Sequence, residues 1–188
     1  MHAADNGIRR PTARASSFAV ALLIVAGLGL VTPAIAADAG IGKALAGIER
    51  LITAKKIDEA EAAARKLVQS LAGKPDAKLD EARAEAVSKL ARVLELAGRF
   101  GDAEAADAEA LRLRQAAKTP DGKLVAASLF GIADMRRRDG RYGDAEKPAR
   151  EALALREAVE GKQSVVVGET LNLLAIIVDR LGRSEELE

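Results

Sequence analysis

The chain has 188 residues, 49% hydrophobic and 30% charged, with 29 lysines and arginines against 28 aspartates and glutamates. This length fits one domain of ordinary size. Cysteine is absent and His2 is the only histidine, which excludes disulfides, cysteine nucleophiles and most familiar acid–base or metal sites.

The distribution of charge argues against a nucleic-acid partner. Residues 1–36 hold three arginines and one aspartate, a net charge of +2, so residues 37–188 carry −1 of the total of +1. Beyond residue 36 the aromatic side chains are Phe100, Phe130 and Tyr142. A balanced chain with so few rings has neither the basic surface nor the stacking platform that nucleic acids require.

Residues 1–36 have the three parts of a secretory signal peptide. Arg9, Arg10 and Arg14 form the basic start, and residues 18–31 form an uncharged apolar run. Ala34 and Ala36 match the small-residue cleavage pattern, which predicts a cut between Ala36 and Ala37. The run is shorter than the roughly 20 residues that a membrane-spanning helix needs.

We therefore expect an exported protein, located in the periplasm of a bacterium, that meets the membrane only through its leader before cleavage. Two alternatives remain: an uncleaved leader that anchors the chain in the inner membrane, and secretion from the cell. Arg9-Arg10 resembles the start of a twin-arginine signal, but Pro11-Thr12 does not supply the apolar residues that should follow.

A repeated motif runs through the rest of the chain at a constant interval. Gly98-Arg99-Phe100-Gly101-Asp102-Ala103-Glu104 returns as Gly140-Arg141-Tyr142-Gly143-Asp144-Ala145-Glu146, and Gly182-Arg183 follows after the same interval. A degenerate copy, Lys55-Lys56-Ile57-Asp58-Glu59-Ala60-Glu61, lies one position out of register. A fixed period of this length is typical of stacked helical repeats.

Each copy predicts two helices joined by the glycine turn. Apolar residues at spacings of three and four precede each turn: Val87, Leu90, Val93 and Leu94; Leu129, Ile132 and Met135; Leu171, Leu174, Ile177, Val178 and Leu181. The second helices are expected at about 101–117 and 143–160. Because one helix pair cannot bury its apolar face, we predict an all-α fold, an α-solenoid of antiparallel helix pairs.

These residues resemble the tetratricopeptide repeat (TPR) family, in particular its kinesin-light-chain type of about 42 residues. The resemblance covers 43–188, with repeats at 43–77, 78–120 and 121–162, an incomplete repeat at 163–188, and a short linker at 37–42. Two departures stand out. Arg136 replaces an apolar residue and is expected to extend to solvent, and Pro148 is expected to kink its helix mildly.

The resemblance implies binding of a protein or peptide on a concave face lined by the first helices. The family's groove positions correspond here to Glu85, Ser88, Arg92 and Glu95; Ala127, Phe130, Asp134 and Arg137; Glu169, Asn172, Ile176 and Asp179. The candidate partner-binding residues are Arg92, Glu95, Phe130, Asp134, Arg137, Asn172, Ile176 and Asp179. Arg136, Arg137 and Arg138 point in different directions at about 100° per residue, so they should not form one phosphate site.

The last stripe, from Leu171 to Leu181, should lack a complete partner helix. An uncovered apolar edge favours self-association or a longer array.

The leading hypothesis is an exported scaffold that holds a partner protein or peptide, with no catalytic residues, metal or cofactor. The alternatives are the recognition part of a larger enzyme or effector system, from a truncated or split array, and a membrane-anchored TPR protein.

Overall fold

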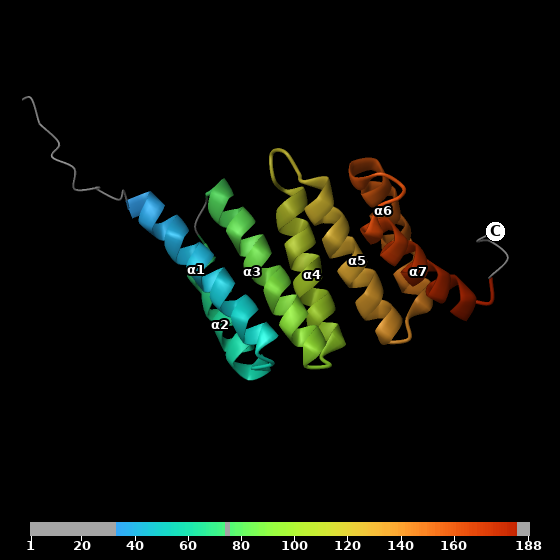
Figure 1. Cartoon of the computed structure of the whole chain (residues 1–188), viewed down its shortest axis with the longest axis horizontal. Coiled ribbons are helices and arrows are strands. Elements are labelled where there is room, and N and C mark those ends of the chain that lie inside the picture. Colours follow the sequence, from blue (N-terminus) through green and yellow to red (C-terminus); the bar gives the residue numbers. More distant parts are fainter. Residues whose placement is uncertain (1–32, 74–75, 184–188) are drawn as a thin grey trace, which may run out of the picture.

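The computed structural model describes residues 33–73 and 76–183, and all the regular structure in them is helical (Figure 1). The helices are α1 (Pro33–Thr53), α2 (Ile57–Leu71), α3 (Ala77–Leu96), α4 (Phe100–Gln115), α5 (Gly122–Arg138), α6 (Tyr142–Glu160) and α7 (Val165–Arg180). The pairs α1–α2, α3–α4 and α5–α6 are followed by α7. The predicted all-α solenoid of helix pairs is confirmed.

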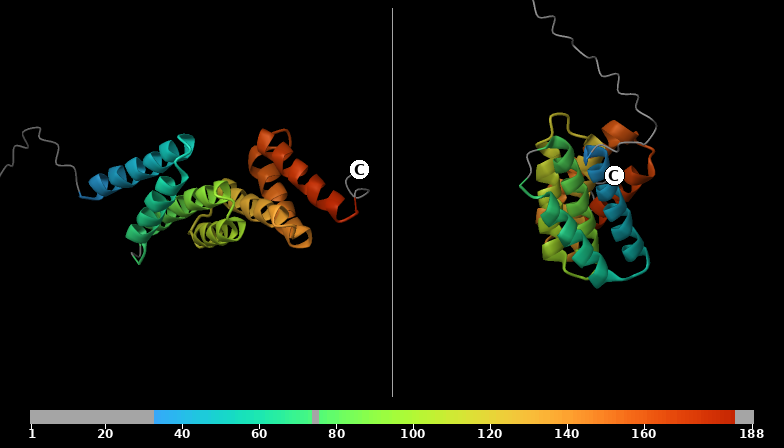
Figure 2. Two further views of the ribbon diagram at one scale, coloured as in Figure 1. Left: turned by 90° about the horizontal axis from the view of Figure 1, so that it is seen from below. Right: turned by 90° about the vertical axis from the view of Figure 1, so that its left-hand side faces the viewer.

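The helices stack in the order in which they occur in the chain. Each helix packs against the next, α1 also contacts α3, and α5 contacts α7. Figure 2 shows that the resulting row is bent rather than straight. Contacts are thus confined to neighbouring repeats, as in other solenoids.

The repeated glycine ends each first helix. Gly98, Gly140 and Gly182 have φ angles of 74°, 75° and 72°, a left-handed conformation that glycine adopts without a side-chain clash. At each turn the N–H of the following arginine donates to a carbonyl in the last turn of the first helix, at 2.8–3.0 Å. This repeated cap explains why the Gly-Arg pair recurs in the sequence.

Lys55 occupies the same turn position in the degenerate first copy. It has a φ of 57° and is the only non-glycine residue with positive φ in the described part of the chain. The following Lys56 N–H donates to the Leu51 carbonyl at 2.9 Å, as in the other turns. The first repeat therefore keeps the turn geometry, but Lys55 adopts a left-handed backbone conformation that is unfavourable for a residue with a side chain.

Side-chain caps begin the first helices of the later repeats. Asp76 accepts a hydrogen bond from the Lys78 N–H (2.9 Å), and Asp121 accepts one from the Lys123 N–H (2.8 Å). Ser164 caps α7 in the same way. These caps satisfy N–H groups that a helix start leaves unpaired, and so fix where α3, α5 and α7 begin.

Small residues in the second helices let the layers approach closely. Ala60, Ala103 and Ala145, at equivalent repeat positions, are each 0% exposed. The predicted stripes of α3 and α5 are buried against these helices. Pro148 is also buried, and α6 continues through it to Glu160.

The N-terminal boundary differs from the expectation. Residues 37–42, predicted to be a linker, are helical, because α1 already begins at Pro33, a residue suited to the first helical position. Ala34, Ala36 and Ala37 lie in this helix. Residues 1–32 of the expected leader lie outside the described residues. Within 33–73 and 76–183, none of the helices combines the length and apolar content needed to cross a membrane.

The stripe of α7 is covered more fully than predicted. Leu174, Ile177 and Val178 are at most 2% exposed, because α5 and α6 pack against them. Leu171 remains 46% exposed and Val165 79% exposed. These two lie about 120° apart around the helix and do not form one patch. The expected uncovered stripe is thus wrong for its core residues, and self-association through this edge stays a prediction.

The arginines of the Gly-Arg turns connect successive repeats. Arg99 pairs with Glu61 (2.8 Å), Arg141 with Glu104, and Arg183 with Glu146 (2.8 Å). In each case the glutamate belongs to the preceding second helix. We call Arg99, Arg141 and Arg183 the turn arginines.

Arg136 contacts the Arg141–Glu104 ion pair instead of extending into solvent. It donates to Glu104 at 2.7 Å and to the Asp144 carbonyl at 2.9 Å. Partial burial of Glu104 opposes ionisation, but hydrogen bonds from Arg141 and Arg136 outweigh it and lower the pKa of this carboxyl.

Two further arginines connect the opposite ends of the helices. Arg114 donates to the Ser128 hydroxyl at 2.6 Å and to the Leu124 carbonyl at 3.1 Å. Arg156, at the equivalent position of the next repeat, donates to the Thr170 hydroxyl at 2.7 Å and to the Val166 carbonyl at 2.8 Å. We call Arg114 and Arg156 the junction arginines. Each joins the end of a second helix to the start of the next first helix.

Candidate functional site

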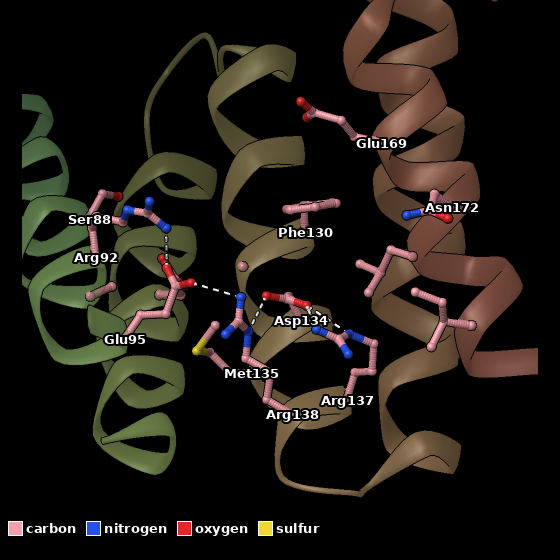
Figure 3. A pocket seen from close by; sticks show the side chains of 15 residues that line it. Ser88, Arg92, Glu95, Phe130, Asp134, Met135, Arg137, Arg138, Glu169 and Asn172 are labelled. Atoms are coloured by element: carbon pink, nitrogen blue, oxygen red, sulfur yellow. Dashed lines mark hydrogen bonds and ion pairs between the residues drawn. The ribbon is translucent and has the colours of Figure 1, made fainter. Parts of the chain in front are cut away.

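A groove of about 520 Å³ lies between the first helices α3, α5 and α7 (Figure 3). Its lining, which defines the central groove, consists of Ser88, Ala91, Arg92 and Glu95 of α3; Asp107 of α4; Phe130, Gly131, Asp134, Met135, Arg137 and Arg138 of α5; and Glu169, Asn172, Leu173 and Ile176 of α7. Because α4 packs against both α3 and α5, it forms the floor between them.

The structure brings most of the predicted partner-binding residues to this groove. Seven of the eight line it: Arg92, Glu95, Phe130, Asp134, Arg137, Asn172 and Ile176. The eighth, Asp179, lies in the last turn of α7 outside the lining. The groove positions implied by the family resemblance therefore lie on one continuous surface. Partner binding by these residues stays a prediction.

A chain of ion pairs crosses the groove from α3 to α5 (Figure 3). Arg92 contacts Glu95 at 2.6 Å, and Arg138 reaches Glu95 at 3.2 Å and Asp134 at 2.7 Å. Arg137 contacts Asp134 at 2.7 Å. The three groove arginines are thus matched by two carboxylates. Arg137 and Arg138 converge on the carboxylate of Asp134, although their spacing in the sequence predicted that they point in different directions.

Apolar side chains also line the groove, beside the polar Glu169 and Asn172 of α7. Phe130 is half-buried, and the guanidinium of Arg156, a residue only 8% exposed, lies 4.3 Å from the centre of its ring. Ile176 is 36% exposed, and Met135 is buried beside the ion pairs. A cation this close to a ring face stabilises the ring's position. The groove therefore presents a fixed aromatic ring and other apolar groups among its charged and polar side chains.

Asp107 at the floor of the groove is a largely enclosed carboxyl without a close partner, and it keeps some access to solvent through the groove. Burial raises its pKa to about 7, although Arg114 favours the ionised form, and the nearby Glu95 adds to the increase. None of the described residues donates a hydrogen bond to it. Arg114 is held by Ser128 and Leu124 and forms no ion pair with Asp107. An unpaired carboxyl removed from water is costly, and such groups concentrate at functional sites.

Asp107 is not among the predicted residues, because the family resemblance assigns groove positions to first helices only. The repeat does contain a signal. Asp107 corresponds to Ala149 one period later and to Ala64 in the first copy, both of which are 0% exposed. Gly131 corresponds in turn to Leu173. Thus Ala149 and Leu173, which belong to one apolar cluster in their layer, are replaced by Asp107 and Gly131 in the layer before it.

The close approach of these two residues depends on the glycine. A Cβ atom at position 131 would lie 2.2 Å from Oδ2 of Asp107, far inside contact distance. Gly131 therefore makes room for the carboxyl.

The described part of the chain contains no group of three or more histidine, cysteine, aspartate or glutamate side chains that could hold a metal ion. The groove offers hydrogen-bonding and charged groups beside apolar side chains.

Comparison with known proteins identifies the repeat. The tetratricopeptide repeat family model matches residues 82–158, which include most of α3 and all of α4 and α5. A solved structure, BtubC (BKLC) from P. vanneervenii, is similar over 78% of this chain, with 25% sequence identity and a TM-score of 0.52. The chain spans about half, 52%, of the length of BtubC. No protein with a curated description matches the sequence. Together, the matched repeat region and the shared fold support a tetratricopeptide-repeat protein.

Proposed function

We propose that the chain is an exported scaffold that holds a partner protein through an extended segment bound in the central groove. Tetratricopeptide repeats suggest a protein-interaction role. The observation that supports this groove as the binding surface is its lining: three successive first helices contribute both charged and apolar side chains, among them Phe130 and Ile176, to one cavity.

The size and rigidity of the groove suit an extended segment. A volume of about 520 Å³ accommodates a few side chains but not a folded domain. The charged side chains of the groove are already held in place by ion pairs with one another: Arg92, Glu95, Asp134, Arg137 and Arg138. A preformed surface loses little conformational freedom on binding, so most of the ordering cost falls on the partner segment.

Site-specific photo-crosslinking would test the groove. A benzoylphenylalanine at Ile176, on the groove wall, should join the chain covalently to one segment of a partner protein in living cells. The same residue at Glu151, which is exposed on α6, is the matched control. Crosslinks that form equally at both positions, or only at Glu151, would show that the partner binds elsewhere.

Export is supported by the pattern of residues 1–36 and has its own test. Cell fractionation followed by N-terminal sequencing should find the protein outside the cytoplasm with Ala37 as its first residue. The mature chain would then begin inside what is α1 and keep its helix from Ala37 to Thr53. An unprocessed chain in the cytoplasm would refute export, and one in the membrane would favour the anchored alternative.

A further inference from the structure

The floor of the central groove holds a carboxyl group that the repeat architecture does not need. Other layers place a buried alanine at this position, whereas Asp107 has no hydrogen-bond donor among the described residues. A largely enclosed, unpaired carboxyl destabilises the fold. Gly131, which corresponds to Leu173 in the next layer, leaves space for this carboxyl. The aspartate and the glycine are thus two departures from the neighbouring repeat that meet at the floor of the groove.

The other charges of the groove leave a surplus of negative charge. The lining contains three arginines and four acidic residues, a net charge of −1 when all are ionised. Glu95 and Asp134 satisfy the arginines. Asp107 and Glu169 remain, and Glu169 contacts Arg156 only loosely, at 3.9 Å. A cation bound at Asp107 would therefore meet a carboxylate that forms no ion pair with the described residues.

The neutral groups of the groove also favour a ligand that carries a hydrogen-bond donor. The Ser88 hydroxyl oxygen, in a residue that lines the groove, is buried without a hydrogen-bond partner. Met135, Leu173 and Phe130 line the same space with apolar surface. This combination suits a side chain with a methylene stem and a cationic end, because the stem can contact the apolar side chains while the charge reaches the floor.

We propose that the central groove receives a lysine or arginine side chain of the partner segment, whose cation forms an ion pair with Asp107. This inference rests on the proposed function and specifies the chemistry of the partner. Because Gly131 has no side chain, the carboxyl of Asp107 fits beside α5 at the floor of the groove. The Arg92–Glu95 and Arg137–Asp134 pairs position the backbone of the segment on either side.

Synthetic peptides provide the test. The probe is an immobilised array of short extended peptides, randomised at every position except the central one, which is lysine, arginine, norleucine or glutamate. Norleucine keeps the lysine stem without its charge. The purified protein is compared with Asp107→Asn, which keeps the size of the side chain, and with Asp58→Asn, an exposed carboxylate on α2 that lies outside the groove. Dissociation constants follow from fluorescence anisotropy with the best lysine peptide and its norleucine counterpart.

We expect peptides with central lysine or arginine to be retained. The norleucine peptide should bind roughly 30-fold more weakly or worse, as expected for a lost desolvated ion pair. Asp107→Asn should weaken the lysine peptide similarly and leave the norleucine peptide unchanged, whereas Asp58→Asn should change neither. Equal binding of lysine and norleucine peptides, or full binding by Asp107→Asn, would overturn the ion pair while leaving peptide binding intact. Failure to retain any peptide would overturn the proposed function itself.

Discussion

Replacing Asp107 with asparagine should stabilise the protein, and the gain should depend on pH. Burial raises the pKa of this carboxyl from its ordinary value of 3.8 to about 7 in the folded state. The folded protein therefore binds more protons than the unfolded chain between these two values. By linkage, stability falls as the pH rises through this window and is constant above it. Asparagine cannot ionise, so the variant should not show this loss.

The size of the effect follows from the two pKa values. The full window corresponds to about 4 kcal/mol, and the part between pH 5 and pH 7 to about 3 kcal/mol. These are upper values, because one side of the carboxyl faces the groove. We therefore expect the difference in free energy of unfolding between Asp107→Asn and the unchanged protein to grow by about 2 kcal/mol or more between pH 5 and pH 8.

Urea unfolding followed by circular dichroism at both pH values would measure this difference. Asp58→Asn, at an exposed position, is the control: its difference in stability from the unchanged protein should be the same at pH 5 and pH 8. The reasoning is refuted if the stability gap is the same at pH 5 and pH 8, or if the unchanged protein gains stability relative to the variant as the pH rises. A variant that is more stable yet binds lysine peptides poorly would also separate the binding role of Asp107 from folding.

Three further predictions concern the repeat contacts. Replacing Arg156 with methionine should lower the free energy of unfolding by about 2–4 kcal/mol, because buried hydrogen-bonding groups lose their partner. The same change at the exposed Arg112 should have a much smaller effect. Equal losses of stability in urea unfolding would contradict this prediction. Lys55→Gly should raise the free energy of unfolding by about 1 kcal/mol by relieving the left-handed turn, and an unchanged or lower value would argue against strain there. Glu104→Gln should reduce acid sensitivity: the pKa of Glu104 is lowered below 4.5, so its stabilisation is present above pH 4.5 and is lost as the pH falls through the folded-state pKa. Unfolding curves at pH 6 and pH 3 should show a smaller loss for this variant than for the unchanged protein, and an equal loss would refute the role of the carboxylate.

The helix pairs could be predicted because the repeat marks both their ends. The Gly-Arg turn defines the boundary between first and second helices, and the observed α4 (Phe100–Gln115) and α6 (Tyr142–Glu160) closely match the expected 101–117 and 143–160. The groove positions are those that the resemblance to the tetratricopeptide family implies for the first helices. Seven of the eight candidate residues consequently line one cavity, and Asp179 falls outside it because the cavity ends one turn earlier on α7.

The remaining features depend on contacts between residues far apart in the sequence. Asp107 reaches the groove from a second helix, and only its proximity to Gly131 shows that the carboxyl has room there. Arg156 carries a charge that sequence patterns place at the surface, yet it is buried by its bonds to Thr170 and Val166. The start of α1 could not be predicted either, since alanine-rich segments fit both a cleavage site and a helix.

The two sets of arginine contacts have a mechanical consequence for the groove. The α3–α4 pair is fastened to α5–α6 by Arg141 and Glu104 at one end and by Arg114 and Ser128 at the other. The same two kinds of contact, through Arg183 and Arg156, fasten α7. Contacts at both ends of the helices oppose rotation of one helix pair relative to the next. These contacts fix the spacing of α3, α5 and α7 in the unbound protein. We therefore expect the groove to select partners by how well a segment fits its shape, and not by closing around the segment.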